Sequence, residues 1–378
     1  MPMKGSKGRI KNSNKTAPYT IAQTSSRFMA YITDEVLLIS IASLIAAQLG
    51  YFPVIFLASF RYLSNEHPIL LHSYYNSLYH TILIFILISF IYYFLEVKIG
   101  YSLGGLIAGN KLYEVSATRK NHERKFFLYF AIINSLVKSL ILFEIINSAF
   151  ALKEKLSQTY IEKKFSIIMV SKNFSEKRSL KRTILLSVMV YFIPILVISF
   201  IAGFYNFYIT LPPPSPHTTF SNDPTFKSVK IIFLNNFILD FYYYILGGFV
   251  LSFLSIVEVF SNSYFSSLFI GGAIKVYPQF LIFGFLPQFL FEGLSYVIGI
   301  ASSFLVASMI IEAMKSYFMG EEIETFSNMI THTGIRVMLL AIISISILFI
   351  SAVIEVFLTS YLLSTYYYII IYHLQFLI

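Results

Sequence analysis

Carboxylate, amide and guanidinium side chains stand inside or beside the long apolar runs of this sequence. An ionised carboxylate at the centre of a bilayer costs about 2.5–3.5 kcal/mol even on the lenient insertion scale. Such groups should therefore face protein, pair with one another or hold a proton. The residues that are candidates for a cation or proton site, or for pairing between helices, are Arg27, Asp34, Asn235, Asn236, Asp240, Glu258, Glu292 and Glu355.

Two interpretations stand for the carboxylates of the second half. They could bind a cation or a proton within the membrane. Alternatively, they could join helices, with Glu292 and Glu355 hydrogen-bonded to Asn236 or to backbone carbonyls. Polar hydrogen bonds between membrane helices are a common assembly device, which favours the second interpretation.

Asp34 has a similar pair of interpretations. Arg27 and Asp34 are seven residues apart, or two helical turns, and could belong to one ion path. Alternatively, Asp34 and Glu35 could mark a helix start, because the exposed amides of a first turn carry partial positive charge. Both interpretations are kept.

The residues argue against other kinds of active site. The chain has no cysteine, which excludes disulfides and thiolate ligands. The spacing of His67, His72 and His80 matches no strong zinc pattern. Residues 100–109 lack the G-x-x-x-x-G-K-[ST] pattern of a phosphate-binding loop, and no motif supports a Ser–His–Asp set. We therefore expect no enzymatic activity, no metal and no cofactor.

Composition indicates a multi-pass membrane protein. Of the 378 residues, 57% are hydrophobic and 12% are charged, and the mean hydropathy is +0.72. Soluble domains carry about 25% charged residues. We predict an all-α, multi-pass helical bundle of roughly six to eight membrane segments, some of them re-entrant or broken.

Basic residues gather between the apolar runs. Residues 1–27, 97–125 and 153–182 hold 21 of the 28 lysines and arginines. Cytoplasmic loops carry such an excess, and anionic lipid headgroups attract it. We therefore expect a protein of the cell membrane with a cytoplasmic N-terminus. Its expected partners are anionic headgroups, unidentified proteins and either cations or protons, but not nucleic acid, and it could form oligomers.

The apolar runs predict where the chain crosses the bilayer. We expect proline near the start of one run to break a span, since it removes a helix hydrogen bond. The predicted segments are 36–58, 77–95, 183–207, a long helix over 231–259, a glycine-ended segment over 262–275, 277–313 broken near Pro287, and 336–360.

The run 126–152 is a special case. It carries Lys138 and Glu144, which a lipid-facing helix would not hold cheaply. A single crossing would also place the basic stretch 153–182 outside, against the positive-inside rule. We predict a re-entrant hairpin or a tilted interfacial helix.

The change of composition around 153–182 suggests two membrane modules. The predicted parts are a basic cytoplasmic tail (1–25), a first membrane domain (26–170), a basic linker (171–182), a second membrane domain (183–363) and an apolar aromatic tail (364–378).

The first half, over about 20–170, resembles the RDD family of small membrane domains. Arg27, Ala30 and Asp34 reproduce its opening R-x-x-A-x-x-x-D, and the stretch GYSLGGLIAGNK at 100–111 is similar to its G-x-[ST]-x-G-x-x-x-x-G segment. The stretch SQTYIEKKFSIIMV at 157–170 is similar to the closing motif of that family, with Glu162 in place of the usual second aspartate. The resemblance makes Glu162 a further site candidate and implies cation/proton exchange, which has been linked to some members.

The second half, over about 183–360, resembles the stage II sporulation protein M family. The resemblance rests on the Asn235-Asn236 pair, on Pro287 followed by Glu292, and on the ending SAVIEVFLTS at 351–360. Pro287-Gln288-Phe289 departs from the usual Pro-His-Gly of that family. That family supports the assembly of cell-wall hydrolases in sporulating bacteria, a role that we do not carry over to this chain.

Two functions are consistent with these observations. The first is a non-enzymatic membrane scaffold that anchors partner proteins through its basic cytoplasmic faces and helix contacts. The alternative is a transporter of cations, protons or small solutes that uses the intramembrane carboxylates.

Overall fold

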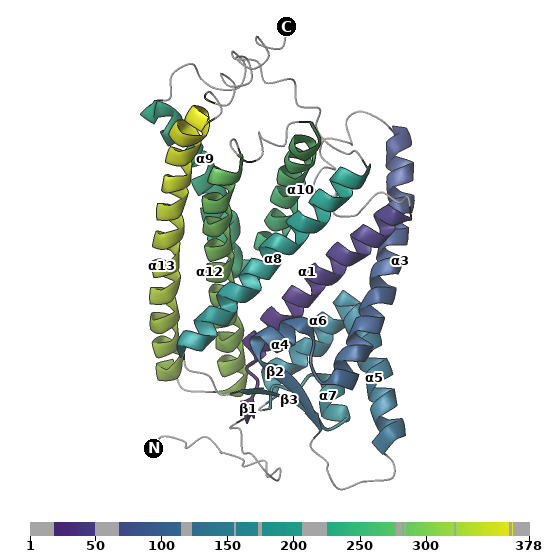
Figure 1. The fold of residues 1–378 in the computed structure, drawn as a ribbon. Coiled ribbons are helices and arrows are strands. Elements are labelled where there is room, and N and C mark those ends of the chain that lie inside the picture. The colour runs from purple at the N-terminus through teal and green to yellow at the C-terminus, as the bar shows by residue number, and fades with distance from the viewer. Residues whose placement is uncertain are drawn as a thin grey trace, which may run out of the picture. The chain divides into compact units, whose positions relative to one another are not determined.

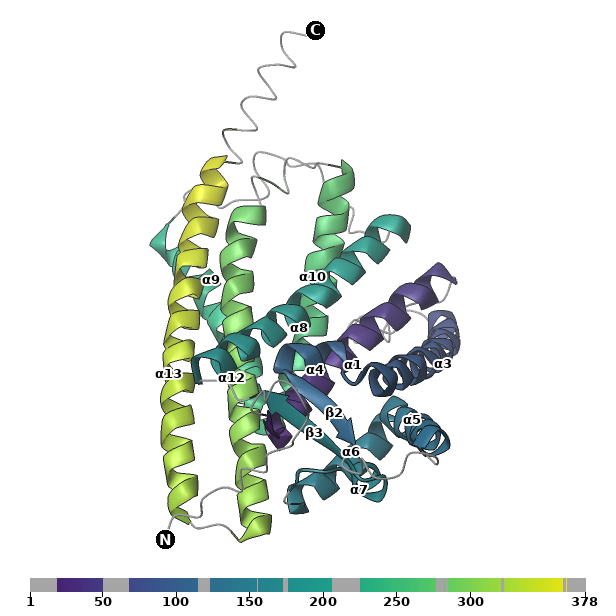
Figure 2. The ribbon, with the colours of Figure 1, turned by 60° about the horizontal axis from the view of Figure 1, so that its bottom comes forward.

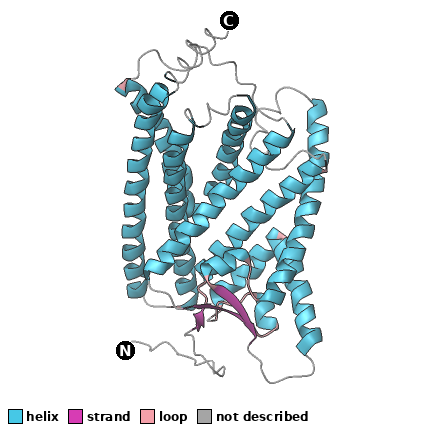
Figure 3. Cartoon of the chain, in the orientation of Figure 1, coloured by secondary structure: helices cyan, strands magenta, loops and turns pink. Residues whose placement is uncertain are grey.

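A computed structural model of the chain describes residues 19–49, 68–114, 123–154, 156–172, 176–205, 225–276, 282, 285–320, 323–362 and 365. Helices make up almost all of it (Figure 3). Within these described residues, six helices are long and apolar enough to cross a membrane, or seven if one bent pair is a single span. The prediction of an all-α, multi-pass helical bundle is therefore confirmed. Residues 206–224, residues 1–18 of the basic tail and most of the C-terminal tail lie outside the described residues.

The elements follow one another along the chain as Figure 1 shows. The α-helices are α1 (Thr24–Gln48), α3 (Pro68–Ile99), α4 (Leu103–Ala108), α5 (Glu123–Ser139), α6 (Ile141–Ala149), α7 (Tyr160–Lys164), α8 (Glu176–Tyr205), α9 (Phe226–Leu239), α10 (Phe253–Val276), α12 (Leu286–Met319) and α13 (Ile323–Val353). The tighter or wider helical turns are η2 (Phe150–Lys153), η3 (Asp240–Ile245), η4 (Leu246–Val250) and η6 (Ile354–Thr359), and the strands are β1 (Tyr19–Ile21), β2 (Asn110–Glu114) and β3 (Ile167–Lys172).

The chain divides into two compact units, which are described separately. Unit 1 comprises residues 1–42, 80–186 and 308–331, and unit 2 comprises 43–79, 187–307 and 332–378. Five long helices, α1, α3, α8, α12 and α13, continue from one unit into the other. The domain boundaries predicted from the sequence stay predictions.

Unit 1 contains a small antiparallel sheet that we did not predict. Its strand order is β1-β3-β2, and Ile21 pairs with Val170 while Lys111 pairs with the same residue from the other side. The sheet lies beside α4 and α7 (Figures 1 and 2). The strands occupy stretches that the sequence analysis treated as a tail and basic loops. Each is only three to six residues long, which is too short for periodicity to reveal.

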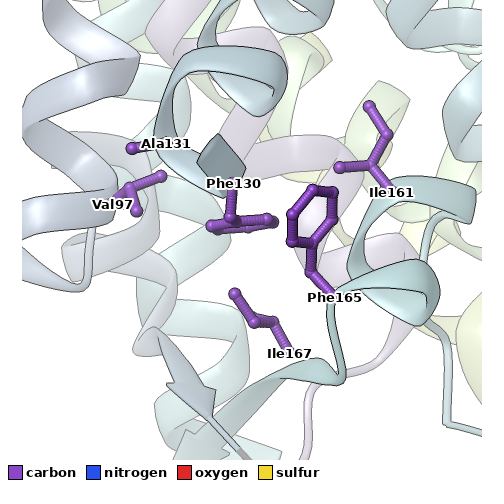
Figure 4. Close-up of a cluster of buried hydrophobic side chains, with 6 residues drawn as sticks. All are labelled: Val97, Phe130, Ala131, Ile161, Phe165 and Ile167. Carbon is purple, nitrogen blue, oxygen red and sulfur yellow. The ribbon is translucent and has the colours of Figure 1, made fainter. Parts of the chain in front are cut away.

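A cluster of apolar side chains attaches this sheet to the long helices of unit 1 (Figure 4). Phe130 of α5 and Phe165 after α7 pack with ring centroids 5.5 Å apart. Burying an aromatic side chain contributes about 1.5–3 kcal/mol. The buried members of the cluster are Val97, Phe130, Ala131, Ile161, Phe165 and Ile167.

The polar run at 126–152 is not a straight helix. Leu128–Ser139 and Ile141–Lys153 are bent by 110° relative to each other. Leu140 between them has extended backbone angles, φ −110° and ψ 90°. The bend is the geometry of a broken or re-entrant segment, and the choice between the two predicted arrangements stays open.

The first span starts earlier than predicted. We expected it to begin at residue 36, but α1 begins at Thr24. Asp34 and Glu35 therefore lie about two to three turns inside the helix and are buried. The interpretation that they occupy an exposed first turn is wrong.

The prediction of one long helix over 231–259 is also wrong, because the helix is interrupted within that range. The α9 helix passes into the π-helical η3 and the 3-10 turn η4, and then Leu251 and Ser252 adopt φ of 49° and 63° before α10 begins. Gly248 allows this break to approach α12, since an added Cβ would lie 2.6 Å from the Ser303 carbonyl oxygen.

The break near Pro287 that we predicted for the span 277–313 stays a prediction, because residues 277–281 and 283–284 lie outside the described residues. Pro287 itself lies in the first turn of α12, which begins at Leu286. A proline there costs no helix hydrogen bond, because the first amides of a helix have no intrahelical acceptor. The position of Pro287 is therefore compatible with the unbroken helix from Leu286 to Met319.

Truncating the apolar cluster should destabilise unit 1. Phe130→Ala removes a ring with no exposed surface and should cost about 3–5 kcal/mol of unfolding free energy. The measurement is denaturant unfolding in detergent, with Leu142→Ala as a control at a side chain that is 75% exposed. Equal midpoints for the two variants would contradict the packing described here.

Candidate functional site

A buried ion pair joins the start of α1 to α7 in unit 1. Arg27 Nη2 donates to both carboxylate oxygens of Glu162, at 2.6 and 2.7 Å. The side chains are 11% and 2% exposed, respectively. Arg27 Nη1 also donates to the carbonyl oxygen of Ser157. The structure therefore brings together two sequence candidates that are far apart in the chain.

The local sequence around α7 explains how the Glu162 carboxylate is held in position to meet Arg27. Thr159 and Glu162 form a capping box at the start of α7, in which the Glu162 carboxylate accepts from the Thr159 amide at 3.0 Å. The carboxylate is thus held by a backbone amide as well as by the guanidinium. Hydrogen bonds that satisfy the remaining lone pairs are what make a buried ion pair tolerable.

The end of α12 contacts the same region of unit 1. Glu312 Oε1 accepts from the amide and the hydroxyl of Ser25, at 3.0 and 2.7 Å. Lys315 donates to the Ser157 hydroxyl, and Arg27 donates to the carbonyl oxygen of the same residue. Sequence analysis did not identify Glu312 and Lys315 as site residues. The one sequence signal for them is that two charged residues stand on a long apolar helix.

Asp34 lies against the start of α4, and not beside Arg27's partner Glu162. Its Oδ1 accepts from the Tyr92 hydroxyl at 2.6 Å and from the Gly104 amide at 2.7 Å. An added Cβ on Gly104 would collide with the Ala30 carbonyl oxygen, so only glycine allows this approach. The motif residues Ala30, Asp34 and Gly104 therefore meet in space.

Glu35 points to a second tyrosine of α3. Its Oε1 accepts from the Tyr93 hydroxyl at 2.6 Å. The ammonium of Lys138 lies 4.9 Å from the centre of the Tyr93 ring and is paired with Glu96 at 2.6 Å. Of these residues, the sequence analysis noted Lys138 as a costly charge but predicted no partner for it.

Glu144 adds another buried carboxylate to unit 1. It accepts from Asn147 Nδ2 and from the Ser148 hydroxyl, both at 2.9 Å. Asn147 in turn accepts from the Ile161 amide at 3.2 Å, which ties α6 to α7. The polar side chains Glu144 and Asn147 of the run 126–152 therefore form hydrogen bonds inside the protein.

In the described part of unit 1, more carboxylates than basic side chains are buried. Among the described residues, the carboxylates of Asp34, Glu35, Glu96, Glu144 and Glu162 are buried, with Arg27 and Lys138 as the cations paired among them. Those two cations are bonded to Glu162 and Glu96. The hydrogen-bond donors that meet Asp34 and Glu35 in this part of the chain are hydroxyls and a backbone amide, all of them neutral.

The candidate carboxylates of unit 2 do not share one set of hydrogen-bond partners. Asp240 is buried and contacts Ser295 and Ser344. Glu292 accepts from Tyr296, one turn along its own helix, at 2.6 Å. Glu355 is close enough to Glu292 to interact with it electrostatically.

The two asparagines of unit 2 do not join these carboxylates. Asn235 is exposed, and its side chain donates to neighbouring Asn236 at 3.5 Å. Glu292 is bonded to Tyr296 and not, within the described residues, to Asn236. Over the described part of the chain, no group of three or more His, Cys, Asp or Glu side chains is arranged to hold a metal ion.

Removing the guanidinium of Arg27 should be costly. Arg27→Ala leaves the Glu162 carboxylate buried without its cation, and such a loss costs about 3–5 kcal/mol. Lys163→Ala is the matched control, because Lys163 pairs with Glu154 but is 59% exposed, and exposed pairs contribute about 0–1 kcal/mol. Denaturant unfolding in detergent measures both, and a cost for Arg27→Ala no larger than the control's would contradict the role of the pair.

Comparison with protein-family models, with curated proteins and with solved structures finds no match for this chain. The two family resemblances therefore rest on the motif residues alone.

Proposed function

We propose that the chain is a cell-membrane transporter that moves protons in exchange for another small cation. Asp34 and Glu35 of unit 1 carry the protons in this proposal. The N-terminus and the basic stretches face the cytoplasm, where lysine and arginine are retained next to anionic headgroups.

One observation carries the proposal: adjacent, buried carboxylates in an apolar helix meet only neutral donors in the described structure. Asp34 and Glu35 are 2% and 6% exposed. Two uncompensated negative charges at such a place would cost several kcal/mol each. The carboxylates therefore hold a proton or a cation at rest, and a group that can release and regain it is the working part of a proton-dependent transporter.

The hydroxyls around the two carboxylates suit proton movement. Tyr92 donates to Asp34 and accepts from the Leu103 amide at 2.8 Å, and Tyr93 donates to Glu35. A phenol both donates and accepts, so each hydroxyl can donate to the carboxylate when it is ionised and accept from the carboxyl group when it holds a proton. The Lys138 ammonium, which is paired with Glu96, lies 4.9 Å from the centre of the Tyr93 ring and so stands beside the phenol that donates to Glu35.

The test is ion flux into liposomes that contain the purified full-length chain. With a sodium or potassium gradient imposed, we expect the internal pH to change. Asp34→Asn and Glu35→Gln should each lower the rate at least about tenfold, because an amide cannot take up the proton. Glu154→Gln is the matched control, since it removes a carboxylate of the same unit from an exposed ion pair.

Three outcomes of the flux assay decide the proposal. Flux in the wild type that is lost in Asp34→Asn or Glu35→Gln, with the fold retained, supports it. Flux that survives both substitutions removes these residues from the transport path. No flux in the wild type with any alkali cation overturns transport.

A second candidate function is a membrane scaffold that anchors partner proteins. The observation in its favour is that carboxylates serve as hydrogen-bond acceptors between elements, as when Asp34 accepts from Gly104 or Asp240 from Ser344. Such bonds rigidify a bundle. The folded part that includes β3 and α7 would offer its exposed Lys163 and Lys164 to a partner.

The scaffold proposal predicts a specific loss of binding. A partner protein cross-linked through 153–172 should co-purify with the wild type, and Lys163→Glu with Lys164→Glu should release it because two cations become anions. Lys98→Glu is the control on another basic stretch. Co-purification that is unchanged by the charge reversal contradicts this role for the basic face.

A further inference from the structure

Unit 2 contains a break in a membrane-length helix at a fully buried carboxylate. Asp240 is the first residue of η3, and its relative exposure is 0%. The helix then continues as the 3-10 turn η4 and ends in the two positive-φ residues Leu251 and Ser252. Wide helical turns inside membrane helices, and helices interrupted at membrane depth, are where proteins place ion sites.

Two serine hydroxyls from two other helices close on Asp240. Ser344 of α13 donates to Asp240 Oδ2 at 2.5 Å, and Ser295 of α12 donates to the same oxygen at 3.3 Å. The two hydroxyl oxygens are 2.9 Å apart. Three oxygens from three elements therefore converge at one buried point.

The hydroxyls have a second set of acceptors. Ser295 Oγ lies 3.0 Å from the Ser344 carbonyl oxygen, and Ser344 Oγ lies 2.9 Å from the Ser295 carbonyl oxygen. Each hydroxyl can therefore give its proton to a backbone carbonyl in place of Asp240. In that arrangement its lone pairs face the carboxylate and can coordinate a cation.

The second carboxylate oxygen of Asp240, Oδ1, is buried and has no hydrogen-bond donor among the described residues. It lies against Gly299 of α12. An added Cβ would lie 2.4 Å from Oδ1, so glycine at this position is what lets α12 pack directly against the carboxylate.

We infer that Asp240, Ser295 and Ser344 form a binding site for one dehydrated monovalent cation of the size of sodium. A single carboxylate neutralises one positive charge, and its described donors are hydroxyls with no cationic side chain among them. Hard cations take oxygen ligands from carboxylates, hydroxyls and carbonyls. A divalent ion would ask for more carboxylates than this site has.

The site is independent of the proton carriers proposed for unit 1. It uses other residues in the other unit, and its occupancy is a binding equilibrium that needs no flux. Failure of the flux assay therefore leaves the site standing, and failure of the binding assay leaves the proton proposal standing.

The experiment is thermal unfolding of the purified full-length chain in detergent, in sodium, potassium or choline chloride at equal ionic strength. A cation that binds only the folded state raises the unfolding midpoint as its concentration rises. We expect sodium to raise the midpoint in a saturable manner, potassium to do so less, and choline not at all.

Variants assign the effect to the site. Asp240→Asn should abolish the sodium-dependent rise, and Gly299→Ala should reduce it, because the added methyl group would collide with Oδ1 and displace the carboxylate. Ser344→Ala, which keeps the carboxylate and serves if Asp240→Asn does not fold, should weaken sodium about tenfold. Glu258→Gln is the control, because it removes a half-buried carboxylate from the same broken helix.

Each result decides the inference. A sodium-specific rise that is lost or weakened in the Asp240 and Ser344 variants but kept in Glu258→Gln supports it. Equal midpoints in sodium and choline overturn it, as does a rise that survives Ser344→Ala and Asp240→Asn unchanged. A midpoint that depends on pH through Asp240 but not on sodium also overturns it and assigns a proton to the carboxyl group.

Discussion

The buried contact between Arg27 and Glu162 is the constraint from which the arrangement of unit 1 follows. Desolvating a guanidinium and a carboxylate costs several kcal/mol per ion, which only close pairing and full hydrogen bonding offset. The pair meets that condition because Glu162 is also held by the capping box of α7 and Arg27 also reaches Ser157. The start of α1 is therefore fixed to α7, and through α7 to β3 and the apolar cluster around Phe165.

With α1 held in this way, the other buried groups of unit 1 have defined partners. Asp34 reaches the Gly104 amide because glycine lets α4 approach the backbone of α1 at Ala30. The neighbouring Glu35 turns to Tyr93, whose ring lies under the Lys138 ammonium. The unit thus separates carboxylates that are paired with a cation, Glu162 and Glu96, from Asp34 and Glu35, whose described hydrogen-bond donors are neutral.

Unit 2 also buries a carboxylate, that of Asp240, but the described groups that donate to it are serine hydroxyls and not arginine or lysine. Asp240 is surrounded by serine hydroxyls, and the chain there leaves the α-helical path as η3 and η4. Gly248 and Gly299 let the interrupted helix and α12 approach closely, and Gly247 lets η4 approach the start of α10. Backbone groups released by such a break must find partners inside the protein, since lipid offers none.

Several features of this protein follow from its sequence alone. Length and hydropathy identify the helical membrane architecture and, to within several residues, the runs at 77–95, 183–207 and 336–360, because the cost of crossing a bilayer is a local sum over about 20 residues. The cost of a buried charge likewise marks Asp34, Asp240 and Glu292 as residues that need an explanation.

The tertiary structure alone decides the partners, because these depend on chain segments far apart: Arg27 and Glu162 are separated by 135 residues, and Asp240 and Ser344 by 104. It also decides the strands and the break after Asp240, since three-to-six-residue strands and a change of helix type leave no periodic signal. The sequence thus states which charges are costly, and only the packing of distant segments determines how each cost is met.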